Sequence, residues 1–220
     1  MLSDREYAVA DASPVSTSPA AAVELARRYD LVGKGVILYT GTFEPYQGLD
    51  LLVKATPIVV RVRPATVFVC VGGKAAQVEA LQRQASSHGV GQYFVFPGEV
   101  PPESVEAHFA IADVLVSLRV SGTNTPLKIY AYLRSGVPIL ATDVRAHTQV
   151  LTSEVALLVE PKPEVIAEGI LRLLTDREFA QSLSANARQL AHEAYSPEAY
   201  HAKVAEVYAF LEAKRPCRKT

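Results

Sequence analysis

The sequence predicts an α/β fold in which one doubly wound parallel sheet is followed by C-terminal helices. Short apolar runs bounded by glycine or proline alternate with helical segments, as expected when a parallel sheet carries helices on both faces. After residue 162 the chain shows helical periodicity alone. With 220 residues, the chain is long enough for one domain of this kind and too short for two.

We expect residues 1–34 to form a flexible lead-in with a short helix at Ala20–Tyr29, and residues 35–220 to form the folded domain. The start of the chain has few bulky apolar groups and is rich in Ala, Ser and Pro. Within the domain, continuous apolar runs predict strands that are buried on both faces. The predicted strands are Val36–Thr40, Thr66–Val71, Tyr93–Phe96, Asp113–Ser117, Ile139–Thr142 and Val155–Val159.

Helices are expected between and after these strands. The clearest signals surround the helix that follows the fourth strand: Thr125 is a good N-cap, Pro126 suits the first helical position, and Gly136 can adopt the left-handed conformation that ends a helix. An ordinary core helix would bury Leu127, Tyr130 and Leu133. The other helices are expected at about residues 49–63, 75–88, 104–112, 163–175, 177–193 and 197–213.

Ligands of parallel sheets bind beyond the carboxyl ends of the strands, so the loops that follow the strands are the candidate site. Glycines at the first of these loops let the backbone approach a ligand or a strand end. In the last loop, free N–H groups at Leu127 and Lys128, the helix dipole and the Lys128 ammonium predict a seat for an anion such as phosphate. The candidate loops are Gly41–Gly48, Gly72–Lys74, Phe96–Val100 and Ser121–Lys128.

The stretch Ser121–Thr142 runs from a polar loop through T-P-L-K-I-Y-x-Y-L to S-G-x-P-I-L-A-T. This order resembles the donor-site helix of retaining, nucleotide-sugar-dependent glycosyltransferases of family 4, or group 1, which have the GT-B fold of two Rossmann-like domains. The resemblance covers about residues 35–212. It implies that this chain is a single Rossmann-like domain, equivalent to the C-terminal, donor-binding half of such an enzyme.

Four positions depart from the family pattern. The two family glutamates, eight residues apart, fall at Thr123 and Ala131, so no catalytic residue of the family is intact. An arginine and a lysine that often hold the diphosphate fall at Thr42 and Gln47, which can donate hydrogen bonds but cannot neutralise charge. The resemblance implies donor-binding residues at Gly41, Thr42, Phe43, Gln47, Gly72, Gly73, Lys74, Phe96, Gly98, Val100, Ser121, Thr123, Asn124, Thr125, Leu127, Lys128 and Ala131.

The resemblance predicts transfer of a sugar from a nucleotide-sugar, with the acceptor side supplied by an absent N-terminal domain or a partner chain. The isolated chain is then expected to be inactive or nearly so. The alternative is a non-catalytic descendant that binds a nucleotide-sugar or a protein. An unrelated Rossmann oxidoreductase is disfavoured because the G-x-G-x-x-G fingerprint and the acid that binds ribose are missing.

Composition and charge exclude several classes of partner and cofactor. A net charge of −1 and a pI of about 6.5 provide no basic field for nucleic acid or an anionic membrane. No apolar run approaches the ~20 residues that span a bilayer. Cys70 and Cys217 suit free thiols in a reducing cytoplasm. No residues have metal-ligand spacing, so neither a metal nor another cofactor is expected. His147 is placed near the site, where a structural capping role, a surface role and a chemical role are all left open.

Two further expectations concern single elements. Val204, Val207, Tyr208 and Leu211 recur three and four residues apart in the last helix, which predicts self-association through Pro197–Leu211 or contact with a partner chain. The family glutamate at position 131 binds both ribose hydroxyls of the donor, so Ala131→Glu is expected to tighten nucleotide-sugar binding at least about tenfold.

Overall fold

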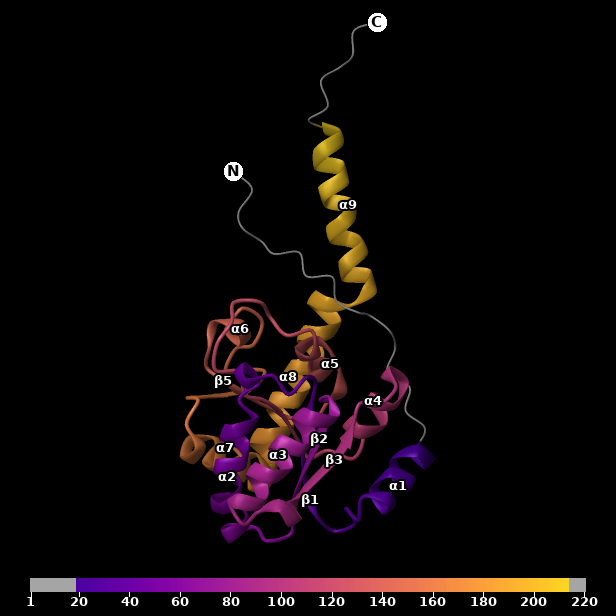
Figure 1. Cartoon of the computed structure of the whole chain (residues 1–220). Helices are drawn as coiled ribbons and strands as arrows, with labels where there is room; N and C mark the ends of the chain where they lie inside the picture. The colour runs from indigo at the N-terminus through magenta and orange to yellow at the C-terminus, as the bar shows by residue number, and fades with distance from the viewer. Residues whose placement is uncertain (1–18, 214–220) are drawn as a thin grey trace, which may run out of the picture.

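A computed structural model describes residues 19–213 of the chain (Figure 1). The described residues contain a sheet of 6 strands in the order β3-β2-β1-β4-β5-β6, and every neighbouring pair is parallel. The predicted doubly wound Rossmann-like sheet is therefore confirmed. The strands are β1 (Gly35–Thr40), β2 (Thr66–Val71), β3 (Phe94–Gly98), β4 (Val114–Ser117), β5 (Ile139–Thr142) and β6 (Leu157–Val159).

Helices connect the strands and close the domain. Short 3₁₀ turns also occur after β1, at Pro45–Gln47, and before β3, at Gly91–Tyr93. The helices are α1 (Pro19–Arg28), α2 (Leu49–Val62), α3 (Ala75–Ser87), α4 (Pro102–Phe109), α5 (Lys128–Ser135), α6 (Arg145–Thr148), α7 (Pro163–Thr175), α8 (Arg177–Tyr195) and α9 (Pro197–Ala213).

The sheet separates two hydrophobic clusters, because successive strand side chains point to opposite faces. In β1, Ile37 and Tyr39 pack with α2, α3 and α7, whereas Val36 and Leu38 pack with α4 and α5 on the other face. Helix α8 contributes to both clusters. This burial on both faces explains why the strands read as continuous apolar runs in the sequence.

The N-terminal helix α1 packs against α4. The Tyr29 ring lies 5.9 Å from the His108 ring, and Leu31 is buried in the core beside β1. Of the expected lead-in over residues 1–34, residues 1–18 lie outside the described residues. The domain boundary at residue 35 stays a prediction.

Helix α9 continues from α8 and projects away from the sheet (Figure 1). Tyr208 on this helix is exposed. The side chains of Val207 and Leu211, and Cys217 beyond the helix, lie outside the described part of the chain. Self-association through this helix therefore stays a prediction. No helix between residues 19 and 213 is both long and apolar enough to cross a membrane.

Candidate functional site

The sheet order reverses between β1 and β4, and open α/β sheets generally have a crevice outside the strand ends at such a switch point. The connection after β1 leads to α2 on one face, and the connection after β4 leads to α5 on the other face. Such switch points are the usual ligand sites of open α/β sheets. The two loops meet there, because a Cβ atom added to Gly41 would lie 3.6 Å from Nζ of Lys128.

Lys128 places a buried amine in this crevice. Its Nζ is shielded from solvent and has no hydrogen-bond partner among residues 19–213, although the residue as a whole is only half-buried. The nitrogen lies 3.8 Å from the centroid of the Tyr39 ring. Burial, and then the positive charge of Arg119, lower the Lys128 pKa well below its usual value. A buried cation without an acceptor is costly, so an anionic ligand would stabilise it.

Arg119 is a second cation at the crevice, and the sequence analysis missed it. It lies just beyond β4, its guanidinium carbon is 5.1 Å from the Tyr46 ring centroid, and its Nη1 donates to the Asn124 carbonyl at 2.9 Å. Its Nε is buried without a partner in the described part of the chain. The available signal was its place directly after a buried strand, at the carboxyl edge of the sheet.

The loop at residues 121–127 is held by its carbonyl groups. Arg119 binds the Asn124 carbonyl, and Nε2 of Gln149 donates to the Thr123 carbonyl. In a trans peptide the C=O and the following N–H point in opposite directions. The N–H groups of Asn124 and Thr125 therefore point away from these partners, and neither has an acceptor within residues 19–213. They are backbone donors available to a ligand.

The start of α5 differs from the prediction. The helix begins at Lys128 rather than Pro126, and Thr125 is not an N-cap. The chain enters through a tighter turn with three-residue spacing, in which the Ile129 N–H donates to the Pro126 carbonyl at 3.0 Å. Consequently Leu127 is 75% exposed and is not part of the buried stripe.

The rest of α5 follows the prediction. Tyr130 and Leu133 are buried, and Gly136 ends the helix with φ 76°. The Tyr132 hydroxyl accepts from the Thr40 N–H at 3.0 Å, which fixes the helix to the end of β1. Ala131, the position of a family glutamate, is half-buried against the core.

The glycines at the strand ends serve close packing of the backbone. A Cβ at Gly48 would lie 2.0 Å from the Leu118 carbonyl oxygen, and a Cβ at Gly72 would lie 2.1 Å from the Gly41 carbonyl oxygen. Both glycines have positive φ. The sequence predicted that these glycines let the backbone approach either a ligand or a strand end. Gly48 lies against a strand end.

Thr42 and Gln47, which replace two family cations, lie together. Nε2 of Gln47 donates to Oγ1 of Thr42 at 3.4 Å, and Oε1 of Gln47 is buried without a partner among the described residues. Phe43, between them, is buried and contacts the rings of Tyr39 and Phe96. Neither Thr42 nor Gln47 carries a charge, and Glu44 in the same loop accepts from Nε2 of Gln77 at 2.9 Å.

The third strand is longer than predicted. Because β3 reaches Gly98, Gly98 lies within the strand and not in a loop after it, and Phe96 is inside the strand and not at its end. Phe96 stacks on Phe94 with 5.5 Å between the ring centroids, and the Gly98 carbonyl accepts from the Gly72 N–H at 2.7 Å. Val100 packs against the core on the α4 and α5 face. All three residues are half-buried.

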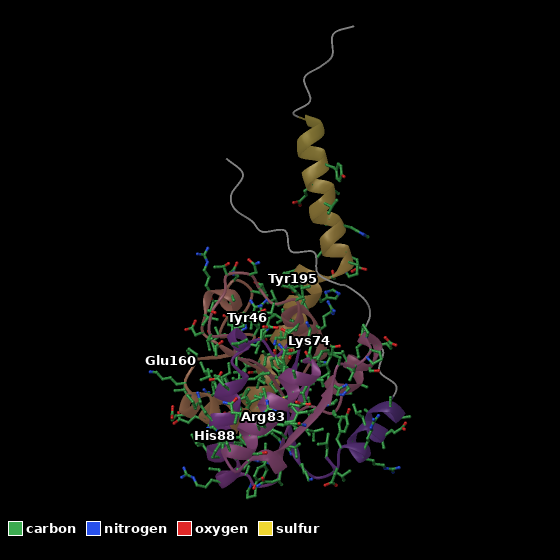
Figure 2. All side chains as sticks on the ribbon, in the orientation of Figure 1. Tyr46, Lys74, Arg83, His88, Glu160 and Tyr195 are labelled. Carbon is green, nitrogen blue, oxygen red and sulfur yellow. The ribbon has the colours of Figure 1, made fainter. Side chains whose placement is uncertain are left out.

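Other predicted residues are exposed at the same edge. Lys74 is the N-cap of α3, and it lies with Tyr46 toward the end of the domain that carries α6, whereas His88 at the far end of α3 lies toward the opposite edge (Figure 2). Gly73 follows β2 beside the Phe43 ring. The remaining exposed candidates are Thr42, Ser121, Thr123 and Asn124.

His147 is wholly buried on α6, so the surface role considered for it is wrong. One ring nitrogen, Nδ1, lies 2.8 Å from the Thr142 carbonyl, and Nε2 lies 2.8 Å from Oγ of Ser117. Burial lowers the His147 pKa to about 4. The ring is therefore neutral near pH 7 and joins the carboxyl ends of β4 and β5.

Two other kinds of site have little support. Among residues 19–213, no group of three His, Cys, Asp or Glu side chains could hold a metal ion. A cavity of ≈ 420 Å³ lies at the opposite edge of the sheet, where its lining includes Gly35, Asp113 and Pro138 at the strand starts. Its Lys34 is paired with Asp30 at 2.7 Å. The cavity is remote from the strand-end loops.

The sequence matches a known family. A profile described as "Glycosyl transferases group 1" matches residues 26–190. The chain is 29% identical over 217 residues to a GDP-mannose-dependent alpha-(1-6)-phosphatidylinositol monomannoside mannosyltransferase of Mycolicibacterium smegmatis, covering 95% of this chain and 56% of the relative. It is 23% identical over 205 residues to an alpha-D-kanosaminyltransferase of Streptomyces kanamyceticus, covering 92% and 52%. The chain thus spans about half the length of these relatives.

Solved structures have the same fold. The Anabaena protein HepE, crystallised with UDP, matches with a TM-score of 0.80 and 17% identity over 89% of this chain and 54% of that protein. The crystallised C-terminal domain of a glycosyl transferase group 1 protein from Francisella tularensis matches with a TM-score of 0.66 and 19% identity, covering 75% of this chain and 88% of that domain. Since the family profile spans most of the described domain, the chain belongs to the glycosyl transferases group 1 family.

Proposed function

We propose that this chain is the donor-binding domain of a retaining glycosyltransferase, and that its crevice holds the diphosphate of a nucleotide-sugar. The observation that carries the proposal is the buried amine of Lys128, which has no partner within residues 19–213 and lies beside Gly41 at the switch point. Arg119 adds a second positive charge close enough to Lys128 to lower its pKa. Two cations without a described acid beside them suit a doubly charged ligand.

The chemistry asked of such a site is mainly positioning and charge stabilisation. When a glycosyl bond to a diphosphate breaks, negative charge grows on the departing phosphate oxygens, and preformed donors lower the barrier. Lys128, Arg119 and the N–H groups of Asn124 and Thr125 are such donors. In the family, positive charge comes from side chains at positions 42 and 47. In this chain, Arg119 after β4 and Lys128 on α5 supply it instead.

The relatives support the choice of ligand. One is named as GDP-mannose-dependent, and HepE was crystallised with UDP. Because these proteins are about twice as long as this chain, we propose that the acceptor side comes from an N-terminal domain or a partner chain. One observation favours a second function: Thr123 and Ala131 stand where the family has carboxylates, which suits a non-catalytic nucleotide-sugar-binding or protein-interaction domain.

Calorimetric titration tests the ligand class. We expect UDP, GDP or ADP, or one of their glucose or mannose derivatives, to bind the purified chain without added metal, and NAD to bind no more than weakly. The diphosphate of NAD has the same charge as that of a nucleotide-sugar, but NAD carries a second ribose and a cationic nicotinamide in place of the sugar. Weak NAD binding would therefore distinguish a nucleotide-sugar site from a general diphosphate site. Absence of binding by every nucleotide would favour the protein-interaction function.

Turnover is expected to need more than this domain. We expect negligible sugar transfer by the purified chain with any of these donors and simple alkyl mannoside or glucoside acceptors, because its 220 residues cover only about half the length of the relatives. Product formation is measured with radiolabelled donors. Robust transfer by the chain alone would contradict the need for a second domain.

Restoring a family carboxylate is expected to strengthen donor binding. Ala131→Glu should tighten nucleotide-sugar binding at least about tenfold, since each charge-assisted hydrogen bond to a ribose hydroxyl contributes roughly 1.5–3 kcal/mol. Ala131→Gln is the matched control, because it has the same shape without the charge and should improve binding less. The substituted side chain also lies three residues after Lys128 on α5. If Glu pairs with this amine instead of the ligand, affinity will fall, and the prediction is wrong.

A further inference from the structure

The hydrogen bonds of His147 define its tautomer. The Thr142 carbonyl can only accept, so Nδ1, which lies 2.8 Å from it, must carry the ring proton. Nε2 of the neutral ring then accepts, and the Ser117 hydroxyl at 2.8 Å donates. The buried imidazole is thereby a cross-link of fixed length between the last residue of β4 and the last residue of β5.

This cross-link extends to Arg119. Oγ1 of Thr142 donates to the Arg119 carbonyl at 2.6 Å, so β5 holds the main chain of Arg119 directly. Ser117, two residues before Arg119, is held by the His147 ring. Ser117 and Thr142 both hydrogen-bond to the His147 ring. They therefore hold the main chain at Arg119 and two residues before it. The Arg119 guanidinium in turn donates to the Asn124 carbonyl and so holds the loop at residues 121–127.

We infer that His147 is a positioning residue that sets the place of the Arg119 guanidinium at the anion crevice. The inference rests on the proposed function for its effect on ligand binding, but the placement itself exists without ligand. The imidazole suits the task because one planar ring supplies a donor and an acceptor to two different strands. Its Thr142 partner is fully buried, and so is Ser117, so water does not compete for these bonds.

Thr142→Val tests the link with the least disturbance. Valine has a similar size but lacks the hydroxyl that holds the Arg119 carbonyl. We expect the variant to bind inorganic pyrophosphate about tenfold more weakly than the parent chain. Thr148→Val is the matched control, since Thr148 is exposed on α6, and it should change the affinity less than about twofold. His147→Phe, which removes both ring bonds, is expected to weaken binding at least as much as Thr142→Val.

A double-mutant cycle separates positioning from general support of the fold. If Thr142 and His147 act through Arg119, their variants should change pyrophosphate affinity less than about twofold in an Arg119→Gln background. The same loss in both backgrounds would overturn the inference. Urea unfolding of every variant accompanies the titrations, and a loss of stability alone does not produce this non-additivity.

A ligand-free measurement keeps the inference independent of the proposed function. The buried Arg119 Nε–H should give a slowly exchanging NMR signal, assigned by its absence in Arg119→Gln. We expect Thr142→Val to speed its exchange at least about tenfold, and Thr148→Val to leave it unchanged. If the parent binds no pyrophosphate or nucleotide, the proposed function fails while this signal still decides the positioning. An Arg119 signal that is identical in the parent and in Thr142→Val would refute it.

Discussion

Replacing Lys128 by Met is expected to weaken nucleoside diphosphate binding about 100-fold while making the fold more stable. The loss of about 100-fold corresponds to ~2.7 kcal/mol, which is within the range for one or two hydrogen bonds from a charged donor to a phosphate. Stability should rise because the parent buries an amine that has no hydrogen-bond partner within residues 19–213. An apolar side chain of similar volume removes the desolvation cost of the unsatisfied buried amine, which is ~1–3 kcal/mol.

The measurements are calorimetric titration with UDP and GDP and urea unfolding of the same preparations. Lys54→Met is the matched control, because Lys54 is an exposed lysine on α2 and lies outside the strand-end loops. It should change affinity and stability little. A Lys128→Met variant that binds as tightly as the parent would remove the main support for the anion site. A destabilised variant would show that the contact of the amine with Tyr39 outweighs its burial.

Acidification is expected to destabilise the fold through His147 by about 3 kcal/mol between pH 7 and pH 4. The folded-state pKa of about 4 lies below the ordinary 6.5, so the unfolded chain binds the proton more tightly. The contribution is fully present above pH 6.5 and is lost as the pH falls toward 4. The full contribution is about 2.5 pH units at about 1.4 kcal/mol each, or ~3.5 kcal/mol, of which about 3 kcal/mol is lost by pH 4.

Urea unfolding at pH 7, 6 and 5 measures the effect. His147→Asn is the informative variant, because an asparagine amide can still donate to the Thr142 carbonyl but does not titrate. Its stability should fall less with pH than that of the parent, by about 2 kcal/mol less between pH 7 and pH 5. His88→Asn, at an exposed site, is the control and should follow the parent. Parallel pH profiles for the parent and His147→Asn would contradict the prediction.

The sheet could be predicted from the sequence because its signals are local and strong. Every residue of β2 and all but one residue of β1 are buried, so the apolar runs mark these strands directly. The end of β3 was missed because Pro97 and Gly98 normally end strands. Here the Gly98 carbonyl still accepts from the Gly72 N–H, and this pairing with β2 extends the strand.

The site could be predicted only in outline. Parallel topology brings the strand-end loops to one edge, and Lys128 follows from that placement. The start of α5 was misplaced because Thr125 and Pro126 are good local signals, whereas side-chain hydrogen bonds from Arg119 and Gln149 hold the preceding loop. The position of Arg119 after a buried strand indicated only the carboxyl edge of the sheet, and no local pattern indicates that its side chain turns inward.

The contact between Lys128 and Tyr39 gives the protein an optical reporter of its own. The chain has no tryptophan, so its absorption near 280 nm is dominated by tyrosine. Burial raises the pKa of Tyr39, whose hydroxyl donates to the Thr42 carbonyl, so the ring keeps the spectrum of a neutral phenol. A ligand that draws the amine from its place 3.8 Å from the ring centroid changes the electric field on that ring. Occupancy of the crevice can then be followed as a tyrosine difference spectrum in unlabelled protein, with Tyr39→Phe as the blank.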